Sequence, residues 1–160
     1  MSHHIQKIVL IEDSDSDAFL IARVIREYPG IGSSYIQRFE TMADARRYFS
    51  ITSDEVSVVL LDLNLPDTSG PLDTYRQLRA VAPSIPVVAL TFSSDHEMAL
   101  GLMRQGIEDY VNKGHVIEQP EFLCRAIAFA VCRANQVQSS LRRLSDELSY
   151  KEQLLNQMVN

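Results

Sequence analysis

Short apolar runs alternate with amphipathic helical patterns along most of this chain. Five of the runs have the length of β-strands and lie at residues 7–12, 34–39, 56–62, 85–92 and 108–112. Each run is followed by a segment with helical periodicity, and these segments cover residues 16–28, 41–50, 71–81 and 94–106 and a stretch that begins at Gln119. Five strand–helix repeats predict an α/β fold with a parallel, doubly wound sheet and right-handed crossovers.

The apolar positions also predict how the elements are buried. The run "VSVVLLD" at 56–62 is the most apolar, which predicts a central strand covered on both faces. In the first helix the spacing predicts one buried face, made of Phe19, Leu20, Val24, Ile25 and Tyr28. Thr41 or a neighbouring residue is expected to cap the second helix.

Polar side chains of a reactive kind come at the ends of the predicted strands. They are Glu12 and Asp13 after the first strand, Asp62 after the third, Thr91 after the fourth and Lys113 after the fifth. In open parallel sheets the site lies beyond the carboxyl ends of the strands. Three carboxylates, one hydroxyl and one ammonium are therefore expected to converge on one edge of the sheet.

The stretch "IEDSDSDAF" at 11–19 holds four carboxylates within six positions. One interpretation is a cation site, because crowded carboxylates raise one another's pKa unless a metal or a lysine neutralises them. The other is an acidic helix N-terminus, where Asp and Ser cap backbone N–H groups and favour the helix dipole.

Four segments together make the chain resemble the receiver domain of two-component response regulators. They are "LIED" at 10–13, "LLDLNLPDTSG" at 60–70, "IPVVALT" at 85–91 and "DYVNKG" at 109–114. The resemblance covers residues 5 to about 130. It implies a flavodoxin-like, five-stranded parallel sheet with strand order 2-1-3-4-5. It also implies a regulatory phosphoacceptor, not an ordinary enzyme, whose donor is a histidine kinase or a histidine phosphotransfer protein.

The resemblance assigns a phosphoacceptor and a cation site by position. Asp62 is the implied phosphoacceptor, and Glu12 and Asp13 are the acidic pair that holds Mg²⁺ (or Mn²⁺) together with Asp62. The backbone carbonyl of Asn64 is expected to complete the cation shell. Mg²⁺ suits carboxylate, carbonyl and water oxygens. Asp15 and Asp17 are then left to cap the first helix and to add to the acidity of the site.

The same resemblance assigns the phosphoryl-binding and switch residues. Thr91 and Lys113 are expected to contact the phosphoryl group, and Thr91 and Tyr110 to form the switch. Lys113 supplies a mobile positive charge with three donors, which matches a phosphoryl oxygen.

Two positions depart from the usual receiver pattern. The residue after the hydroxyl is normally small, and here it is Phe92, a ring that would either shield an acyl phosphate from water or impede the donor. The residue after the lysine is normally a proline joined through a cis bond, and here it is Gly114. A cis bond without proline costs about 2.5–4 kcal/mol, so the bond before Gly114 is either trans or cis under strain.

Two other kinds of site are weighed against this one. Asp13, Asp15 and Asp17 start like a calcium-binding EF-hand loop, but that loop needs Gly at its sixth position and Glu at its twelfth, where Ala18 and Val24 stand. A haloacid-dehalogenase-type phosphatase also uses a strand-end Asp. That family needs a second Asp two residues later, and Asn64 occupies the position.

Composition and charge indicate which binding partners and which cellular location to expect. The 160 residues carry a net charge of −6, with 17 acidic and 10 basic side chains in residues 1–120, which argues against direct nucleic-acid contact. No segment approaches the roughly 20 apolar residues that span a bilayer. Because "MSHHIQK" at 1–7 has no apolar core, we expect no secretory signal. Cys124 and Cys132 lie about 12 Å apart along one predicted helix, too far for a disulfide. We expect a cytoplasmic protein without membrane contact.

The last 40 residues predict one long helix rather than a DNA-binding domain. Apolar residues on alternating three and four spacings form an a/d stripe, made of Leu123, Ile127, Ala130, Ala134, Val137, Leu141, Leu144, Leu148, Leu155 and Met158 and interrupted by Lys151. We therefore expect a receiver core at 1–120 and, at 121–160, a fifth helix that extends into a coiled coil. Residues 134–158 predict a parallel homodimer that transmits the switch to an output. The alternative is a stand-alone receiver that acts as a phosphate shuttle or as an interaction module, without an attached output.

Overall fold

The computed structural model describes residues 5–159, which form one parallel sheet flanked by helices. The strands are β1 (Lys7–Ile11), β2 (Tyr35–Phe39), β3 (Val58–Asp62), β4 (Val87–Thr91) and β5 (Asp109–Asn112). They follow the order β2-β1-β3-β4-β5, and all four pairings are parallel. The predicted fold class and strand order are confirmed. Residues 1–4 and 160, which belong to the predicted regions 1–120 and 121–160, lie outside the described residues.

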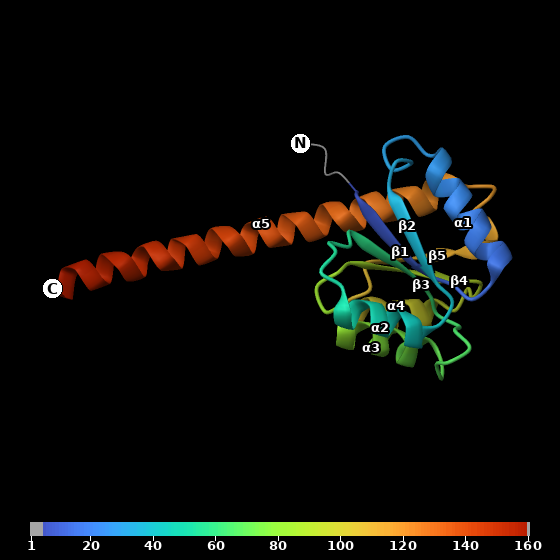
Figure 1. Ribbon diagram of the computed structural model, residues 1–160, viewed down its shortest axis with the longest axis horizontal. Coiled ribbons are helices and arrows are strands. Elements are labelled where there is room, and N and C mark those ends of the chain that lie inside the picture. Colours follow the sequence, from blue (N-terminus) through green and yellow to red (C-terminus); the bar gives the residue numbers. More distant parts are fainter. Residues whose placement is uncertain (1–4, 160) are drawn as a thin grey trace.

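Helices cover both faces of the sheet (Figure 1). They are α1 (Asp15–Glu27), α2 (Met42–Ile51), α3 (Pro71–Val81), α4 (His96–Arg104) and α5 (Pro120–Val159), with a short 3₁₀ turn at Lys113–His115. One face of the sheet packs against α1 and α5, and the other packs against α2, α3 and α4. Each face has its own apolar core, and the sheet separates the two.

The central strands β3 and β4 are buried along their whole length. Because side chains alternate across a strand, each strand supplies both cores. Leu60 and Leu90 point to the α1–α5 side, whereas Val59 and Leu61 point to the side of α2, α3 and α4. This double burial explains the apolar run at 56–62 and holds the carboxyl end of β3 firmly in place.

The helix starts follow from local capping. Thr41 accepts a hydrogen bond from the backbone N–H of Asp44, as predicted. The cap of α1 was predicted wrongly: Ser14 accepts the bond from the N–H of Asp17, and Asp15 and Asp17 lie in the first turn of the helix instead. A serine hydroxyl at the position before the helix reaches those N–H groups directly, which leaves both aspartates available for other contacts.

The buried face of α1 also differs from the predicted one. Ile25 is buried as predicted, but Ala18 and Ile21 are buried as well, which the spacing did not predict, and Phe19 is 67% exposed. Val24 and Tyr28 pack against the edge of the core. The helix carries two neighbouring apolar stripes, and the one that contains Ala18, Ile21 and Ile25 packs on the sheet.

Helix α5 has two parts in different surroundings. Its first part is buried against the sheet through Leu123, Cys124, Ala126, Ile127, Ala130 and Val131. Beyond Asn135 every described residue of the helix is exposed, and the helix extends away from the body of the protein to Val159 without a break (Figure 1). Cys124 and Cys132 are both free thiols. None of the helices within residues 5–159 is at once long and apolar enough to cross a bilayer.

Candidate functional site

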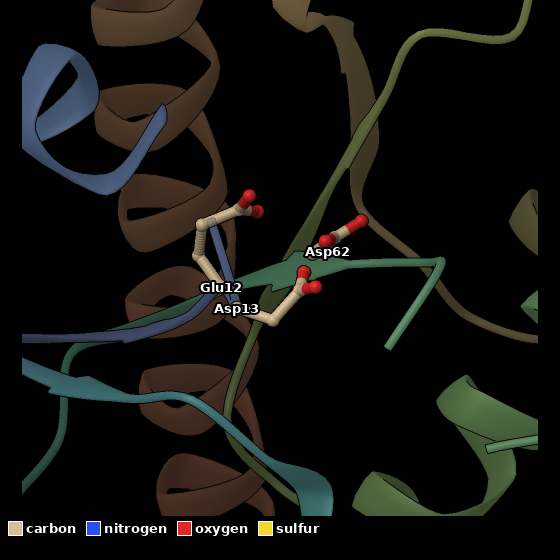
Figure 2. A group of neighbouring side chains, drawn as sticks. All are labelled: Glu12, Asp13 and Asp62. Carbon is tan, nitrogen blue, oxygen red and sulfur yellow. The ribbon is translucent and has the colours of Figure 1, made fainter. Parts of the chain in front are cut away.

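The side chains predicted from the strand ends meet at one edge of the sheet. Asp62 and Thr91 are the last residues of β3 and β4, Glu12 and Asp13 follow β1, and Lys113 follows β5. Carboxylate oxygens of Glu12, Asp13 and Asp62 lie within 4.8 Å of one another. Figure 2 shows these three side chains close together at the ends of β1 and β3. The structure thus places all five predicted groups on the same edge.

Lys113 is the positive charge within this carboxylate cluster. Its ammonium Nζ donates to both oxygens of Glu12, at 3.0 and 2.9 Å, and lies 3.4 Å from Asp62 and 3.5 Å from Asp17. Burial alone would lower the pKa of Lys113, but the hydrogen bond to Glu12 and the charges of the aspartates outweigh burial and raise it. The lysine therefore stays protonated and neutralises the cluster.

Glu12 is fully buried, and burying its carboxylate charge is unfavourable. Burial raises the pKa of Glu12 to about 7, although its bond to Lys113 acts in the opposite direction. The pKa of Asp13 is raised as well, first by partial burial and then by the neighbouring Asp62 carboxylate. Both groups bind protons more readily than isolated carboxyl groups do.

The donor set fits a hard divalent cation. Three carboxylates from two adjacent strands supply the oxygen ligands that Mg²⁺ and Mn²⁺ prefer, and exposed Asp13 leaves one side open to water ligands. The backbone N–H of Asn64 donates to Oδ1 of Asp62 at 3.0 Å, which fixes the carboxylate orientation. The role of the Asn64 carbonyl as a cation ligand stays a prediction.

Thr91 and Tyr110 lie on the neighbouring strands β4 and β5. Thr91 is buried, and its hydroxyl accepts a hydrogen bond from the backbone N–H of Ser93 at 3.0 Å. Tyr110 is half-buried and packs against the core on the side of α2, α3 and α4. Because the Thr91 hydroxyl is bonded to the loop after β4, loss of its bond to Ser93 would alter the conformation of that loop.

The two departures from the receiver pattern have clear positions. The Lys113 ammonium lies 5.1 Å from the ring centroid of Phe92, a cation–π distance, and the ring is 60% exposed. The ring therefore contacts the lysine from the solvent side. No cis peptide bond occurs within residues 5–159, so the bond before Gly114 is trans. The N–H of Gly114 donates to the side chain of Asn112 at 2.8 Å.

Two polar side chains near the site were not predicted from the sequence. Arg38, near the end of β2, donates to the backbone carbonyl of Glu12 at 3.0 Å and to the Asp15 carboxylate at 2.8 Å. Asp67, in the loop after β3, accepts from the first two backbone N–H groups of α2, at 3.0 and 2.8 Å. The position of Arg38 at the carboxyl end of a strand was the available signal.

The comparisons with known proteins agree with this geometry. The family described as response regulator receiver domain matches residues 8–126. The cell cycle transcriptional regulator CtrA of Caulobacter vibrioides is 29% identical over 107 residues, which are 67% of this chain and 43% of CtrA. The chain spans less than half the length of the curated relatives that head the comparison.

Solved structures resemble the fold. A CheY-like response regulator receiver domain protein from Methanospirillum hungatei superposes with a TM-score of 0.67 at 13% identity, covering 82% of this chain and 98% of that one. The Mn²⁺-bound form of response regulator Rcp1 superposes with a TM-score of 0.57 at 22% identity, covering 67% and 80%. At these identities the likeness concerns the arrangement of the strands and helices.

Mg²⁺ binding should strengthen as the pH rises from about 6 to about 8. Because burial raises the pKa of Glu12 to about 7, the carboxyl holds a proton below that pH, and the proton must leave before a cation binds. Affinity should therefore fall as the pH falls through about 7. Isothermal titration calorimetry in buffers of different ionisation enthalpy would measure both affinity and proton release.

Glu12→Gln should flatten this pH profile, whereas Asp146→Asn, an exposed change on α5, should leave it unaltered. An affinity that stays constant from about pH 6 to about pH 8 in the unmodified protein would contradict the role given to Glu12.

Proposed function

Because this chain belongs to the response regulator receiver domain family, we propose that it accepts a phosphoryl group on Asp62 and transmits the change through α5. The observation that carries this proposal is the setting of Asp62. Its carboxylate lies 3.4 Å from the Lys113 ammonium and beside two further carboxylates. Phosphoryl transfer depends mainly on positioning and on neutralising charge, and this arrangement provides an anionic nucleophile between an ammonium and a cation site.

In the proposed transfer, a carboxylate oxygen of Asp62 attacks the phosphorus of a phosphohistidine on a donor protein. The new O–P bond forms as the N–P bond breaks, and the electron pair of the broken bond stays on the imidazole nitrogen. Asp62 becomes an acyl phosphate. The Lys113 ammonium and the Thr91 hydroxyl each donate to a phosphoryl oxygen, which spreads the transferred negative charge over the chain's own donors.

Glu12, Asp13 and Asp62 are the residues that would hold Mg²⁺ or Mn²⁺, with the Asn64 carbonyl as a further ligand. When bound, the cation neutralises the phosphoryl oxygens and orients them for in-line transfer. The Mn²⁺-bound form of Rcp1, which shares the fold, supports this choice of ion. Fixing three carboxylates on two strands keeps the ligands in place while the phosphoryl group arrives.

The donor is a histidine kinase or a histidine phosphotransfer protein. The chain acts as a regulatory phosphoacceptor that promotes only its own phosphorylation and dephosphorylation. A phosphatase of the haloacid dehalogenase type is disfavoured because Asn64, which cannot serve as a general acid, stands two residues after Asp62. The exposed apolar stripe of α5 favours coupling to a partner helix over a stand-alone phosphate shuttle.

Phosphorylation should require Asp62. With Mg²⁺ and a small phosphodonor such as acetyl phosphate, the protein should gain one labile phosphoryl group, because Asp62 is the carboxylate that the ammonium and the cation site flank. Intact-mass spectrometry would count the groups. Asp62→Asn should remain unmodified, and Asp146→Asn should be modified like the unaltered protein. Equal labelling of Asp62→Asn would show that the phosphoacceptor is another residue.

The phosphorylated state should rearrange Thr91 and Tyr110. When Thr91 donates to a phosphoryl oxygen, its hydroxyl leaves the N–H of Ser93, and Tyr110 moves inward into the vacated space. Such a step biases two existing arrangements of β4, β5 and their loops. NMR spectra with beryllofluoride, a phosphoryl mimic, should shift the Ser93 amide and the Tyr110 ring signals. In Thr91→Ala the mimic should still bind but leave the Tyr110 signals in place. If both signals stay fixed in the unaltered protein with the mimic bound, the switch uses other residues.

Residues 134–158 should form a parallel homodimer. The stripe residues Val137, Leu141, Leu144, Leu148 and Leu155 are exposed, Leu141 by 61%. Burying each Leu side chain between helices is worth roughly 1.5–3 kcal/mol. Against this stand Lys151 within the stripe and the like charges of Glu147 and Glu152 across a parallel pair, and an exposed charge pair is worth at most about 1 kcal/mol. The apolar contribution is larger, so the dimer should form.

Sedimentation velocity at tens of micromolar should find a dimer. Leu141→Gln combined with Leu144→Gln should give monomers that still accept phosphate. Arg142→Gln combined with Arg143→Gln changes the neighbouring positions of the same turn, outside the stripe, and should leave the dimer intact. A monomeric unaltered protein would mean that the stripe serves a different partner.

A further inference from the structure

Strand β2 supplies no carboxylate to the cation site, yet it holds the segment that does. Arg38 is the penultimate residue of β2 and lies opposite Leu10 of β1 in the sheet. Its Nε donates to the backbone carbonyl of Glu12 at 3.0 Å, and one amino group donates to the Asp15 carboxylate at 2.8 Å. The same amino group lies 3.9 Å from Glu40.

The two hydrogen bonds of Arg38 lie on either side of Asp13, the exposed member of the cation site. One falls on the residue before Asp13 and the other falls two residues after it, so the guanidinium spans the whole turn from β1 to α1. The backbone N–H of Glu12 also donates to the carbonyl of Phe39 at 2.9 Å. Both peptide groups that flank the Glu12 side chain are therefore tied to β2, as is the first turn of α1.

Most of the Arg38 side chain is enclosed by the protein, and 27% of it is exposed. The second amino group of Arg38 is buried and has no acceptor within residues 5–159, and it is the one side-chain atom of that kind in this part of the chain. The other two side-chain nitrogens of Arg38, Nε and the first amino group, both donate to the turn from β1 to α1.

We propose that Arg38 is a positioning residue for the cation site, where it fixes the Glu12–Asp15 turn so that the Asp13 carboxylate faces Asp62. This inference rests on the cation site of the proposed function. Planar guanidinium donors point in two fixed directions, which suits a carbonyl and a carboxylate on either side of one turn. Groups that orient metal ligands from outside the coordination shell change metal affinity about 10- to 100-fold when they are removed.

The charge of Arg38 has the opposite effect on a cation and has to be separated from its geometry. A guanidinium near the site repels a divalent ion, but Asp15 is its direct partner and nearly cancels that charge. Replacing Arg38 alone would leave the Asp15 carboxylate unpaired and attract the cation. Replacing Arg38 and Asp15 together keeps the net local charge unchanged and removes the hydrogen bonds that hold the turn.

The test is Mn²⁺ binding to the full chain at about pH 8, with free Mn²⁺ measured by electron paramagnetic resonance. Arg38→Gln combined with Asp15→Asn should weaken Mn²⁺ binding at least about tenfold. Arg46→Gln, an exposed arginine on α2, should bind as the unaltered protein does. Circular dichroism without the metal would establish that each variant is folded, so that the loss reports on the site and not on stability.

Arg38→Lys is the second variant, because it keeps the charge and most of the side-chain packing. A single ammonium cannot hold the carbonyl and the carboxylate in the guanidinium geometry, so this variant should also bind Mn²⁺ more weakly. Affinity equal to that of the unaltered protein, in the lysine variant or in the charge-balanced one, would overturn the positioning role. Absence of Mn²⁺ binding in the unaltered protein would instead refute the cation site itself.

Discussion

Three carboxylates confined to adjacent strand ends repel one another, and the Lys113 ammonium is the charge that allows them to stay there. Lys113 follows β5, and its ammonium reaches Glu12 after β1. In the sheet β4 and β3 lie between these two strands. This ion pair therefore connects the ends of β1 and β5 at the edge of the sheet on which the site lies. Any group that competes for Glu12 or Asp62, or that draws the ammonium to itself, must redistribute bonds among β1, β3 and β5. A switch of the kind proposed would therefore begin with a change in the bonds of Lys113.

Much of the fold and of the site could be predicted because both depend on local patterns. An apolar run followed by a helical period identifies each strand–helix unit, and the rule for parallel sheets then places Asp62, Thr91 and Lys113 on one edge. The buried face of α1 was mispredicted in part, for a physical reason. Residues 18–25 carry two interleaved apolar stripes, and only the surface against which the helix packs selects Ala18 and Ile21 over Phe19.

Contacts between distant segments were beyond such patterns. Arg38 meets Glu12 across 26 positions, and Asp67 meets the start of α2 across 25. Neither pairing has a sequence spacing that could reveal it, because each depends on which strand lies next to which and how the loops return. Both contacts fix loops rather than supply reacting groups, so a search restricted to reactive side chains passes over them.

The a/d repeat of α5 runs through one continuous helix whose first part is buried and whose later part is exposed. Up to Ala130 the stripe packs on the sheet, Ala134 is half-buried, and from Val137 on the stripe is exposed. Where the helix leaves the body, Arg133 is bonded to Glu108, one residue before β5, at 3.1 Å. From Val131 to Val159 the helix spans about 42 Å, so a tilt of about 5° at its root would move its tip by roughly 4 Å. If the proposed function holds, a small rearrangement of β5, the strand that carries Tyr110 and precedes Lys113, would displace the far end of α5 enough to change how it meets a partner helix.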